Sequence, residues 1–178
     1  VPADGAVSCV NPSGVYSREY FTELVNSAHR MGAEFIAAYQ HWGSYNSGVV
    51  KAAQVREARF MAEAGADLIF GSHPHMVQRS CYIRTSDGRR VPCAYSLGNL
   101  LSSMSEMTGN RDGVILRAEL RRTDGGISAD VTYIPCFTVE DTFGTSAVPL
   151  TAVHSAESYK SAERTKTAMG GGIGVRGY

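Results

Sequence analysis

Two predicted helices, each ended by a glycine and followed at once by a short apolar run, constrain the fold of this chain more than any other feature. Apolar residues recur at helical spacing over 17–31 and again over about 50–64. The runs that follow, 34–39 and 67–71, have the length and composition of buried strands. Helices that alternate with short buried strands are typical of a parallel β-sheet layer. We therefore predict an α/β fold.

The following part of the chain carries β patterns instead. Residues 79–85 and 89–96 are predicted to form a hairpin around an Asp-Gly turn. Two further strands are predicted over 113–120 and 128–137. The expected architecture is an αβαβ parallel layer followed by mostly antiparallel strands.

The chain has 178 residues, which is enough for one domain with a hydrophobic core. Residues 1–16 contain two prolines and two glycines and are predicted to be irregular. We assign residues 17–154 to the domain. Residues 155–178 are predicted to form a polar helix and then a glycine-rich tail, which we expect to be mobile.

The charge balance excludes some classes of partner. Lys and Arg together number 17, as do Asp and Glu, so the formal net charge is zero. A neutral chain is not expected to bind nucleic acid or an anionic membrane surface. The 178 residues contain no apolar run long enough to span a bilayer and no basic-then-apolar leader, so neither an anchor nor a signal peptide is predicted within them.

Four cysteines are present, and none belongs to a C-x-x-C pair, so a thiolate zinc site is not expected. Cys81 and Cys93 flank the predicted hairpin turn and would lie nearly opposite each other. Two interpretations stay open for the cysteines. Cys81 and Cys93 could form a disulfide in an oxidising compartment, or the thiols could all remain unpaired and mostly buried.

Three histidines follow predicted strands. His41 comes after the strand at 34–39, and His73 and His75 come directly after the strand at 67–71. Open α/β sheets place their ligand sites at the carboxyl ends of strands, and histidine is the commonest metal ligand. In an extended loop, His73 and His75 would point to opposite sides and could serve two neighbouring metals. The alternatives are a surface loop that happens to hold two histidines and a half-buried His41.

Two polar residues are weaker candidates for substrate binding. Asn99 follows a predicted strand end and the turn residue Gly98, so it could orient a ligand or only turn the chain. Arg111 lies near the end of a predicted loop over 98–112 and could meet an anionic group or remain solvated. Ser96 has no G-x-S-x-G context, which argues against a serine hydrolase.

Taken together, these segments resemble the bacterial capsule synthesis CapA family, also called poly-γ-glutamate synthesis PgsA-like proteins. The resemblance extends over residues 17–137. The matching pieces are His41-Trp42-Gly43, Gln54, Gly65-Ala66-Asp67-Leu68-Ile69-Phe70-Gly71-Ser72-His73-Pro74-His75, Gln78, Tyr95-Ser96-Leu97-Gly98-Asn99 and the weaker Tyr133-Ile134-Pro135. That family is similar to the calcineurin-like metallophosphoesterases, which are four-layered α/β/β/α proteins with two metals.

The resemblance implies a ligand set. His41 and His73 would bind one divalent metal (Mn, Zn or Fe) and His75 a second one. The metals would activate water for attack on phosphorus and neutralise the developing charge. The resemblance also implies a role in capsule or poly-γ-glutamate biosynthesis, with the synthesis machinery as partner, at the cell surface or on the membrane.

The sequence departs from the family pattern in two ways. Ser44 stands where the family usually has a glutamate, and residues 1–40 hold no match to the family's Asp-containing strand end, Gly-Asp motif or Asn-rich motif. The chain therefore resembles the C-terminal half of a larger domain. We expect it to hold metal weakly by itself, not to catalyse alone, and to self-associate or pair with a chain that carries the other half. The alternative is a non-catalytic cell-surface assembly or export factor without bound metal.

Overall fold

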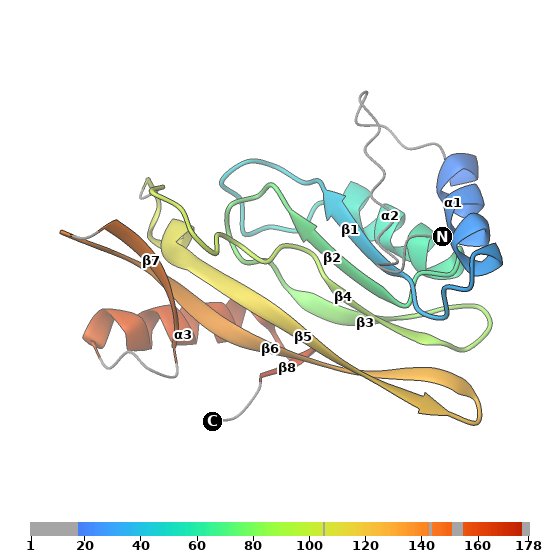
Figure 1. The fold of residues 1–178 in the computed structure, drawn as a ribbon. Helices are drawn as coiled ribbons and strands as arrows, with labels where there is room; N and C mark the ends of the chain where they lie inside the picture. Colours follow the sequence, from blue (N-terminus) through green and yellow to red (C-terminus); the bar gives the residue numbers. More distant parts are fainter. Residues whose placement is uncertain (1–17, 105, 143, 151–154, 176–178) are drawn as a thin grey trace.

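Two facing β-sheets form the centre of the computed structural model, which describes residues 18–104, 106–142, 144–150 and 155–175 (Figure 1). In the described residues, each sheet has four strands. The first sheet has the order β1 (Ala37–His41), β2 (Leu68–Ser72), β4 (Arg90–Ala94) and β3 (Ser80–Arg84). The second consists of β5 (Asp112–Thr123), β6 (Gly126–Asp141), β7 (Gly144–Pro149) and the short β8 (Gly174–Val175), which pairs with β6. The helical elements are α1 (Arg18–Arg30), α2 (Ala52–Glu63), the 3-10 turn η1 (Thr108–Arg111) and α3 (Ala156–Met169).

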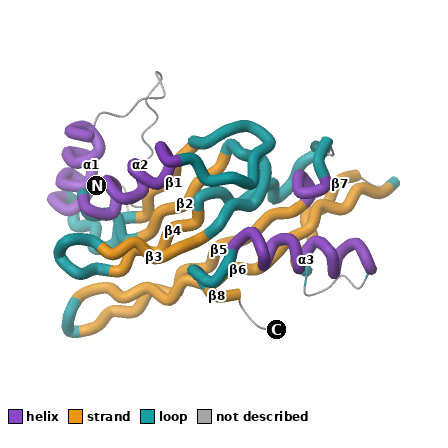
Figure 2. The backbone as a smooth tube through the Cα atoms, turned by 180° about the vertical axis from the view of Figure 1, so that it is seen from behind, coloured by secondary structure: helices purple, strands orange, loops and turns teal. Residues whose placement is uncertain are grey.

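The first sheet confirms the predicted parallel α/β layer. Strand β2 runs parallel to both β1 and β4, and the β3–β4 hairpin closes the sheet on one side. Helices α1 and α2 cover one face of this sheet (Figure 2). Their buried side chains share a core with the sheet, for example Val25 of α1, Met61 of α2 and Ile69 of β2. This burial of apolar surface explains why the two glycine-ended helices fold onto the strands that follow them.

Helix α2 does not bury all the residues that its apolar pattern suggested. Ala53 and Val55 are exposed, whereas the polar Gln54 is 2% exposed. The Gln54 side chain accepts a hydrogen bond from the Lys51 backbone nitrogen at 2.8 Å and donates one to the Gln78 side-chain oxygen at 2.9 Å. A buried amide is stable when its hydrogen bonds are satisfied. These contacts therefore explain why Gln54 is buried while the apolar Ala53 and Val55 are exposed.

The second sheet packs its inner face against the first. Leu68 and Ala94 of the first sheet share a core with Val114 and Tyr133 of the second. Strand β5 pairs with β6 over its whole length, and both strands extend beyond the predicted strands at both ends. Strand β7 was not predicted, because its small residues and its terminal proline give a weak strand pattern.

Part of the glycine-rich segment at 170–175 is docked against β3, whereas the sequence predicted a mobile tail there. Ile173 is 1% exposed, and its backbone nitrogen donates to the Ser80 hydroxyl at 2.9 Å. That hydroxyl donates in turn to the carbonyl of Met169, also at 2.9 Å. Gly172 packs so closely on the Ser80 backbone that a Cβ atom would collide with it. The missing side chain therefore permits close packing.

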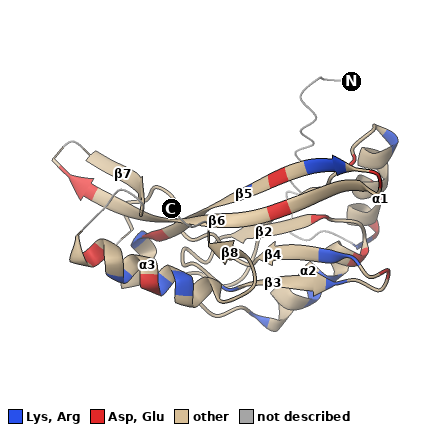
Figure 3. Ribbon diagram, turned by 90° about the horizontal axis from the view of Figure 1, so that it is seen from below, with Lys and Arg blue, Asp and Glu red and all other residues tan. Residues whose placement is uncertain are grey.

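Basic and acidic residues are interleaved along α3 and along the β5–β6 hairpin (Figure 3). An exposed ion pair joins the hairpin to the segment before β1, since both terminal nitrogens of Arg122 lie 2.6 Å from the Glu34 carboxylate. Within the described ranges, no helix is long and apolar enough to cross a membrane. The predicted irregular segment at 1–16 lies outside the described residues.

Candidate functional site

The three histidines named from the sequence lie close together at one end of the first sheet. His41 is the last residue of β1 and pairs in register with Ser72, the last residue of β2. His73 and His75 follow in the loop that leaves β2. The ring centroids of His41 and His73 are 4.6 Å apart, and those of His73 and His75 are 6.4 Å apart. The parallel pairing of β1 and β2 explains this, since it brings the two strand ends to the same edge.

The loop backbone is folded back, not extended as the sequence suggested. His73 has φ +94° and His75 has φ +54°, a region that residues with side chains rarely adopt. Surrounding contacts hold this conformation: the Pro74 carbonyl accepts from the Ser47 backbone nitrogen at 3.2 Å, and the His75 carbonyl accepts from the Asn110 amide at 3.1 Å. Strained backbone persists where neighbouring structure fixes it, and such positions cluster at functional sites.

Asn99 orients the imidazole of His75. The Asn99 side-chain nitrogen donates to the Asn110 carbonyl at 2.9 Å, so its oxygen is directed toward His75 Nδ1, also at 2.9 Å. An amide oxygen only accepts hydrogen bonds, so Nδ1 of His75 carries the proton and Nε2 keeps its lone pair. The weak substrate-binding candidate Asn99 is thus a hydrogen-bond partner of a histidine in the structure.

Asn110 is the residue that the sequence reasoning missed. It is fully buried, and its amide nitrogen donates to the carbonyl of His75 at 3.1 Å and to the side-chain oxygen of Asn46 at 2.9 Å. Its own side-chain oxygen accepts from the Met107 backbone nitrogen at 2.9 Å. The available signal was an asparagine beside a glycine in a long loop, which is also the pattern of an ordinary turn.

Neighbouring side chains contact the other two histidines. His41 Nδ1 lies 3.4 Å from the hydroxyl of Ser72, and the Tyr39 hydroxyl contacts the same Ser72 oxygen. Partial burial, followed by the nearby His41 and His75, lowers the pKa of His73 below its ordinary value. The neutral imidazole is the form that binds metals, so this environment favours a ligand over a cation.

The distances between the imidazole rings limit which pairs of these histidines could bind the same metal ion. Two imidazoles that share one ion at a metal–nitrogen distance of about 2.1 Å have ring centroids about 4.5–5.2 Å apart. The 4.6 Å between His41 and His73 fits a shared ion, while the 6.4 Å between His73 and His75 fits two neighbouring ions. In the part of the chain that is described, no three His, Cys, Asp or Glu side chains gather closely enough to surround a single ion. The ring spacing of His41 and His73 therefore allows one shared ion, and the described residues place no third His, Cys, Asp or Glu side chain close enough to join them.

The indole of Trp42 packs closely against the strand that leads to the histidine loop. Its Nε1 donates to the Tyr95 carbonyl at 2.7 Å, and the ring lies close over Gly71 of β2. A Cβ at Gly71 would collide with both the indole and that carbonyl. Position 71 therefore requires glycine, because the Trp42 indole and the Tyr95 carbonyl approach its backbone too closely for a side chain.

Arg111 has structural partners. Its Nε donates to the Thr138 carbonyl at 2.9 Å, its Nη1 lies 3.3 Å from the Glu157 carboxylate, and its guanidinium stacks on the Phe137 ring at 4.5 Å. These contacts join the 98–112 loop to β6 and α3. They give no support to the predicted contact with an anionic substrate.

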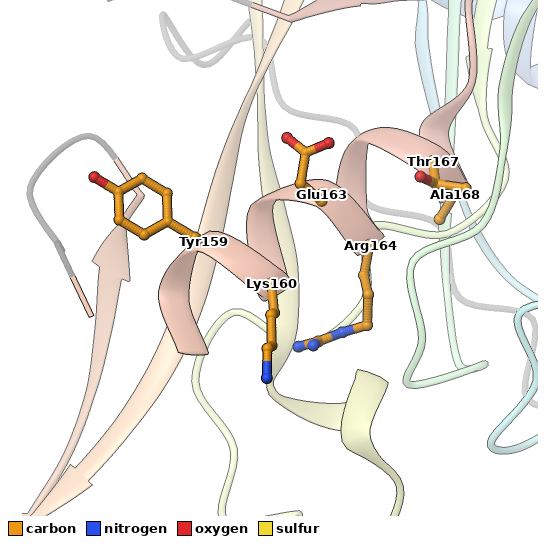
Figure 4. A pocket seen from close by; sticks show the side chains of 6 residues that line it. All are labelled: Tyr159, Lys160, Glu163, Arg164, Thr167 and Ala168. Carbon is orange, nitrogen blue, oxygen red and sulfur yellow. The ribbon is translucent and has the colours of Figure 1, made fainter. Parts of the chain in front are cut away.

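A surface depression of about 710 Å³ lies elsewhere, along α3 (Figure 4). All six residues that line it come from this one helix: Tyr159, Lys160, Glu163, Arg164, Thr167 and Ala168. Arg164 also hydrogen bonds to the buried Asp112 carboxylate through two nitrogens at 2.8 Å. The depression therefore borders an ion pair that fastens the helix to β5.

Comparison with known proteins gives the family of the chain. The model of the bacterial capsule synthesis protein PGA_cap matches residues 4–104, which include His41, His73, His75 and Asn99 but not Arg111. The "PGA biosynthesis protein CapA" of Bacillus subtilis (strain 168) is 30% identical over 108 residues, which are 61% of this chain. The chain spans about a quarter (27%) of the length of that relative. With over half of its residues matched by the family model, this chain belongs to the bacterial capsule synthesis protein family PGA_cap.

Proposed function

We propose that this chain supplies the histidine ligands of a divalent-metal centre in a capsule or poly-γ-glutamate biosynthesis protein, and that this centre belongs to a phosphoesterase-like hydrolase. The observation that carries the proposal is the convergence of His41 and His73, with ring centroids 4.6 Å apart, beside His75. The family match and the name of the Bacillus subtilis relative support the biosynthetic role.

Each histidine has a distinct part in this proposal. His41 and His73 hold one Mn, Zn or Fe ion, and His75 presents Nε2 to a second ion because Asn99 holds its Nδ1 proton. When bound, the metals supply Lewis acidity and lower the pKa of water near a phosphoryl group. Two facing sheets with helices on the outside of the first one support a metallophosphoesterase-like fold.

The carboxylate ligands would come from outside the described residues. Ser44 lies where an acid is expected, and the described acids do not gather with the histidines. Because the chain spans 27% of its relative, another segment or another chain could complete the centre. We therefore propose self-association or a partner with the complementary acidic residues, together with the capsule synthesis machinery at the cell surface.

Elemental analysis of the purified chain tests the metal centre directly. We expect manganese, zinc or iron to co-purify with the wild type or to bind on titration, and His73→Ala and His75→Ala to lose it. His29→Ala is the matched control, because His29 lies at the end of α1, where its Nδ1 contacts the Ala33 carbonyl. Equal metal content in all four proteins would refute the histidine site.

A second candidate function follows from the missing acids. A non-catalytic assembly or export factor needs no metal, and the described residues contain no complete ligand set. Binding of poly-γ-glutamate that is unchanged in His73→Ala, in a protein without metal, would favour this alternative. Metal-dependent hydrolysis of a phosphodiester that is lost in the same variant would exclude it.

A further inference from the structure

Two thiols face each other across the β3–β4 hairpin. One is on β3, and the other is on β4, the strand that precedes Asn99. Cys81 and Cys93 occupy opposite positions in the antiparallel register, and both are free. Cys93 is fully buried, whereas Cys81 lies on the edge strand β3 and is partly exposed. Cys81 is therefore the more accessible of the two thiols.

The register places the two residues at a distance suited to a disulfide. The Tyr95 backbone nitrogen donates to the Arg79 carbonyl at 3.2 Å, so this pair is hydrogen-bonded. Pairs alternate along an antiparallel ladder, which makes Cys81 and Cys93 the next hydrogen-bonded pair, with Cα atoms about 5.5 Å apart. Disulfides most often join Cα atoms about 5.5–6 Å apart. The Cys93 side chain also lowers the pKa of the Cys81 thiol.

Two further groups lie near the sulfur of the partly exposed Cys81. Cys81 Sγ lies 4.0 Å from the Tyr95 hydroxyl, and the Arg79 guanidinium lies 5.3 Å from the centre of the Tyr95 ring. A hydroxyl donor and a cation both stabilise a thiolate. In contrast, burial raises the pKa of Cys136, which lies on β6. Among the cysteines of the described residues, Cys81 is thus the one whose surroundings favour the reactive thiolate.

We propose that Cys81 and Cys93 form a thiol–disulfide exchange site that reacts with low-molecular-weight disulfides and closes a bond across the hairpin. The Cys81 thiolate attacks one sulfur of the reagent, which forms a mixed disulfide and releases one reagent thiolate. Cys93 then gives its proton to that thiolate and attacks Cys81 Sγ, which expels the second reagent thiolate. The two protein thiols are oxidised, and one reagent disulfide is reduced to two thiols, the second after protonation by water.

The bond would lock two attachments of the hairpin. Ser80, next to Cys81, holds the glycine-rich segment at Ile173, and β4 continues from Cys93 into the segment that ends at Asn99. A closed disulfide would therefore join β3 to β4 between Ser80, which holds Ile173, and Asn99, which contacts His75. This inference does not depend on the metal centre, so either can fail alone.

Intact-mass analysis after exposure to oxidised glutathione tests the exchange site. The experiment uses the full chain with Cys9→Ser, because Cys9 lies outside the described residues. We expect a loss of two hydrogens, Cys93→Ser to keep one bound glutathione, and Cys81→Ser to react about tenfold more slowly or not at all. Cys136→Ser should behave like its parent.

Two results would overturn the proposal. One is a stable mixed disulfide in the chain that retains both Cys81 and Cys93, and the other is an equal rate of modification in Cys81→Ser. Circular dichroism of each variant before oxidation shows that it is folded. Reduction of the oxidised chain should restore its original mass and its original melting temperature, which identifies the disulfide as the product.

Discussion

His75 Nδ1 lies 2.9 Å from the side-chain oxygen of Asn99, across 24 residues of sequence. This contact fixes which imidazole nitrogen carries the proton and leaves the other one available as a ligand. Asn110 closes the arrangement, because its backbone carbonyl holds the Asn99 amide and its side chain holds the His75 carbonyl. Hydrogen bonds thus hold both the ring and the backbone carbonyl of His75 in place.

Removing the Asn99 amide should release the His75 ring. In Asn99→Ala we expect the fixed Nδ1–H tautomer to give way to a mixture, and metal affinity to fall about 10–100-fold. The Asn110 carbonyl also loses a buried partner, which should cost about 1–2 kcal/mol of stability. Nitrogen-15 chemical shifts of the imidazole report the tautomer, and a metal titration reports the affinity.

Asn26→Ala is the control for this experiment, because Asn26 is exposed on α1. It should leave both the tautomer and the metal affinity at their wild-type values. An unchanged His75 tautomer in Asn99→Ala would mean that another group orients the ring.

Gly71 should not tolerate a side chain. In Gly71→Ala the added methyl group meets the Trp42 indole and the Tyr95 carbonyl, so the ring must move or the strand must shift. Overpacking of this kind usually costs about 1–3 kcal/mol. Urea denaturation measures the loss, and Trp42 fluorescence reports the displacement, since this chain has only one tryptophan.

Gly48→Ala gives the comparison for Gly71→Ala. A Cβ at Gly48 would reach only the Val77 carbonyl at 4.0 Å, which is ordinary contact. Its stability should change by less than about 1 kcal/mol, since Ala in place of Gly also restricts the unfolded chain. Equal stability of the two variants would contradict the close packing of Trp42.

The fold could be predicted where local patterns were strong. Each glycine-ended helix and the strand after it produced a clear change of period, and the convergence of His41 with His73 followed from parallel pairing of their strands. The Asp-Gly turn likewise placed Cys81 opposite Cys93, as the register confirms. These features depend on sequence neighbours or on one general rule of sheet topology.

The remaining features depend on contacts between distant segments. Asn110 lies 35 residues from His75, and Ile173 lies 93 residues from Ser80, so neither contact leaves a local pattern. A glycine-rich stretch with one isoleucine resembles a mobile tail until the surface that receives it is known. Gln54 interrupted an apolar stripe, and only its partner Gln78 explains its burial.

The ion pair between Arg164 and Asp112 should be a strong attachment of α3. Asp112 accepts from Nε and Nη2 of Arg164 at 2.8 Å and from Ser161, and its side chain is 5% exposed. Arg164→Leu leaves this carboxylate buried without its cation, which should cost about 3 kcal/mol. Urea denaturation of the variant checks the value.

Arg117→Leu is the matched control for the ion pair. Arg117 lies 2.8 Å from Glu119, but both side chains are about 40% exposed, at 42% and 39%. Exposed pairs of this kind contribute less than about 1 kcal/mol. Adding Asp112→Asn to Arg164→Leu should recover part of the lost stability, because the unpaired charge is removed. No recovery would show that packing of the arginine stem, not charge, holds the helix.

The pH dependence of cysteine alkylation should separate Cys81 from an ordinary thiol. A hydrogen bond from Cys93, with help from Tyr95 and Arg79, lowers the pKa of Cys81 to about 6. The thiolate is the reactive form, so alkylation should reach half its maximal rate near pH 6, whereas a free cysteine does so near pH 8.5. In Cys93→Ala the midpoint should move to higher pH, because the hydrogen bond is lost. The unfolded chain in urea should show the ordinary midpoint, and a folded chain with that same midpoint would contradict a stabilised thiolate.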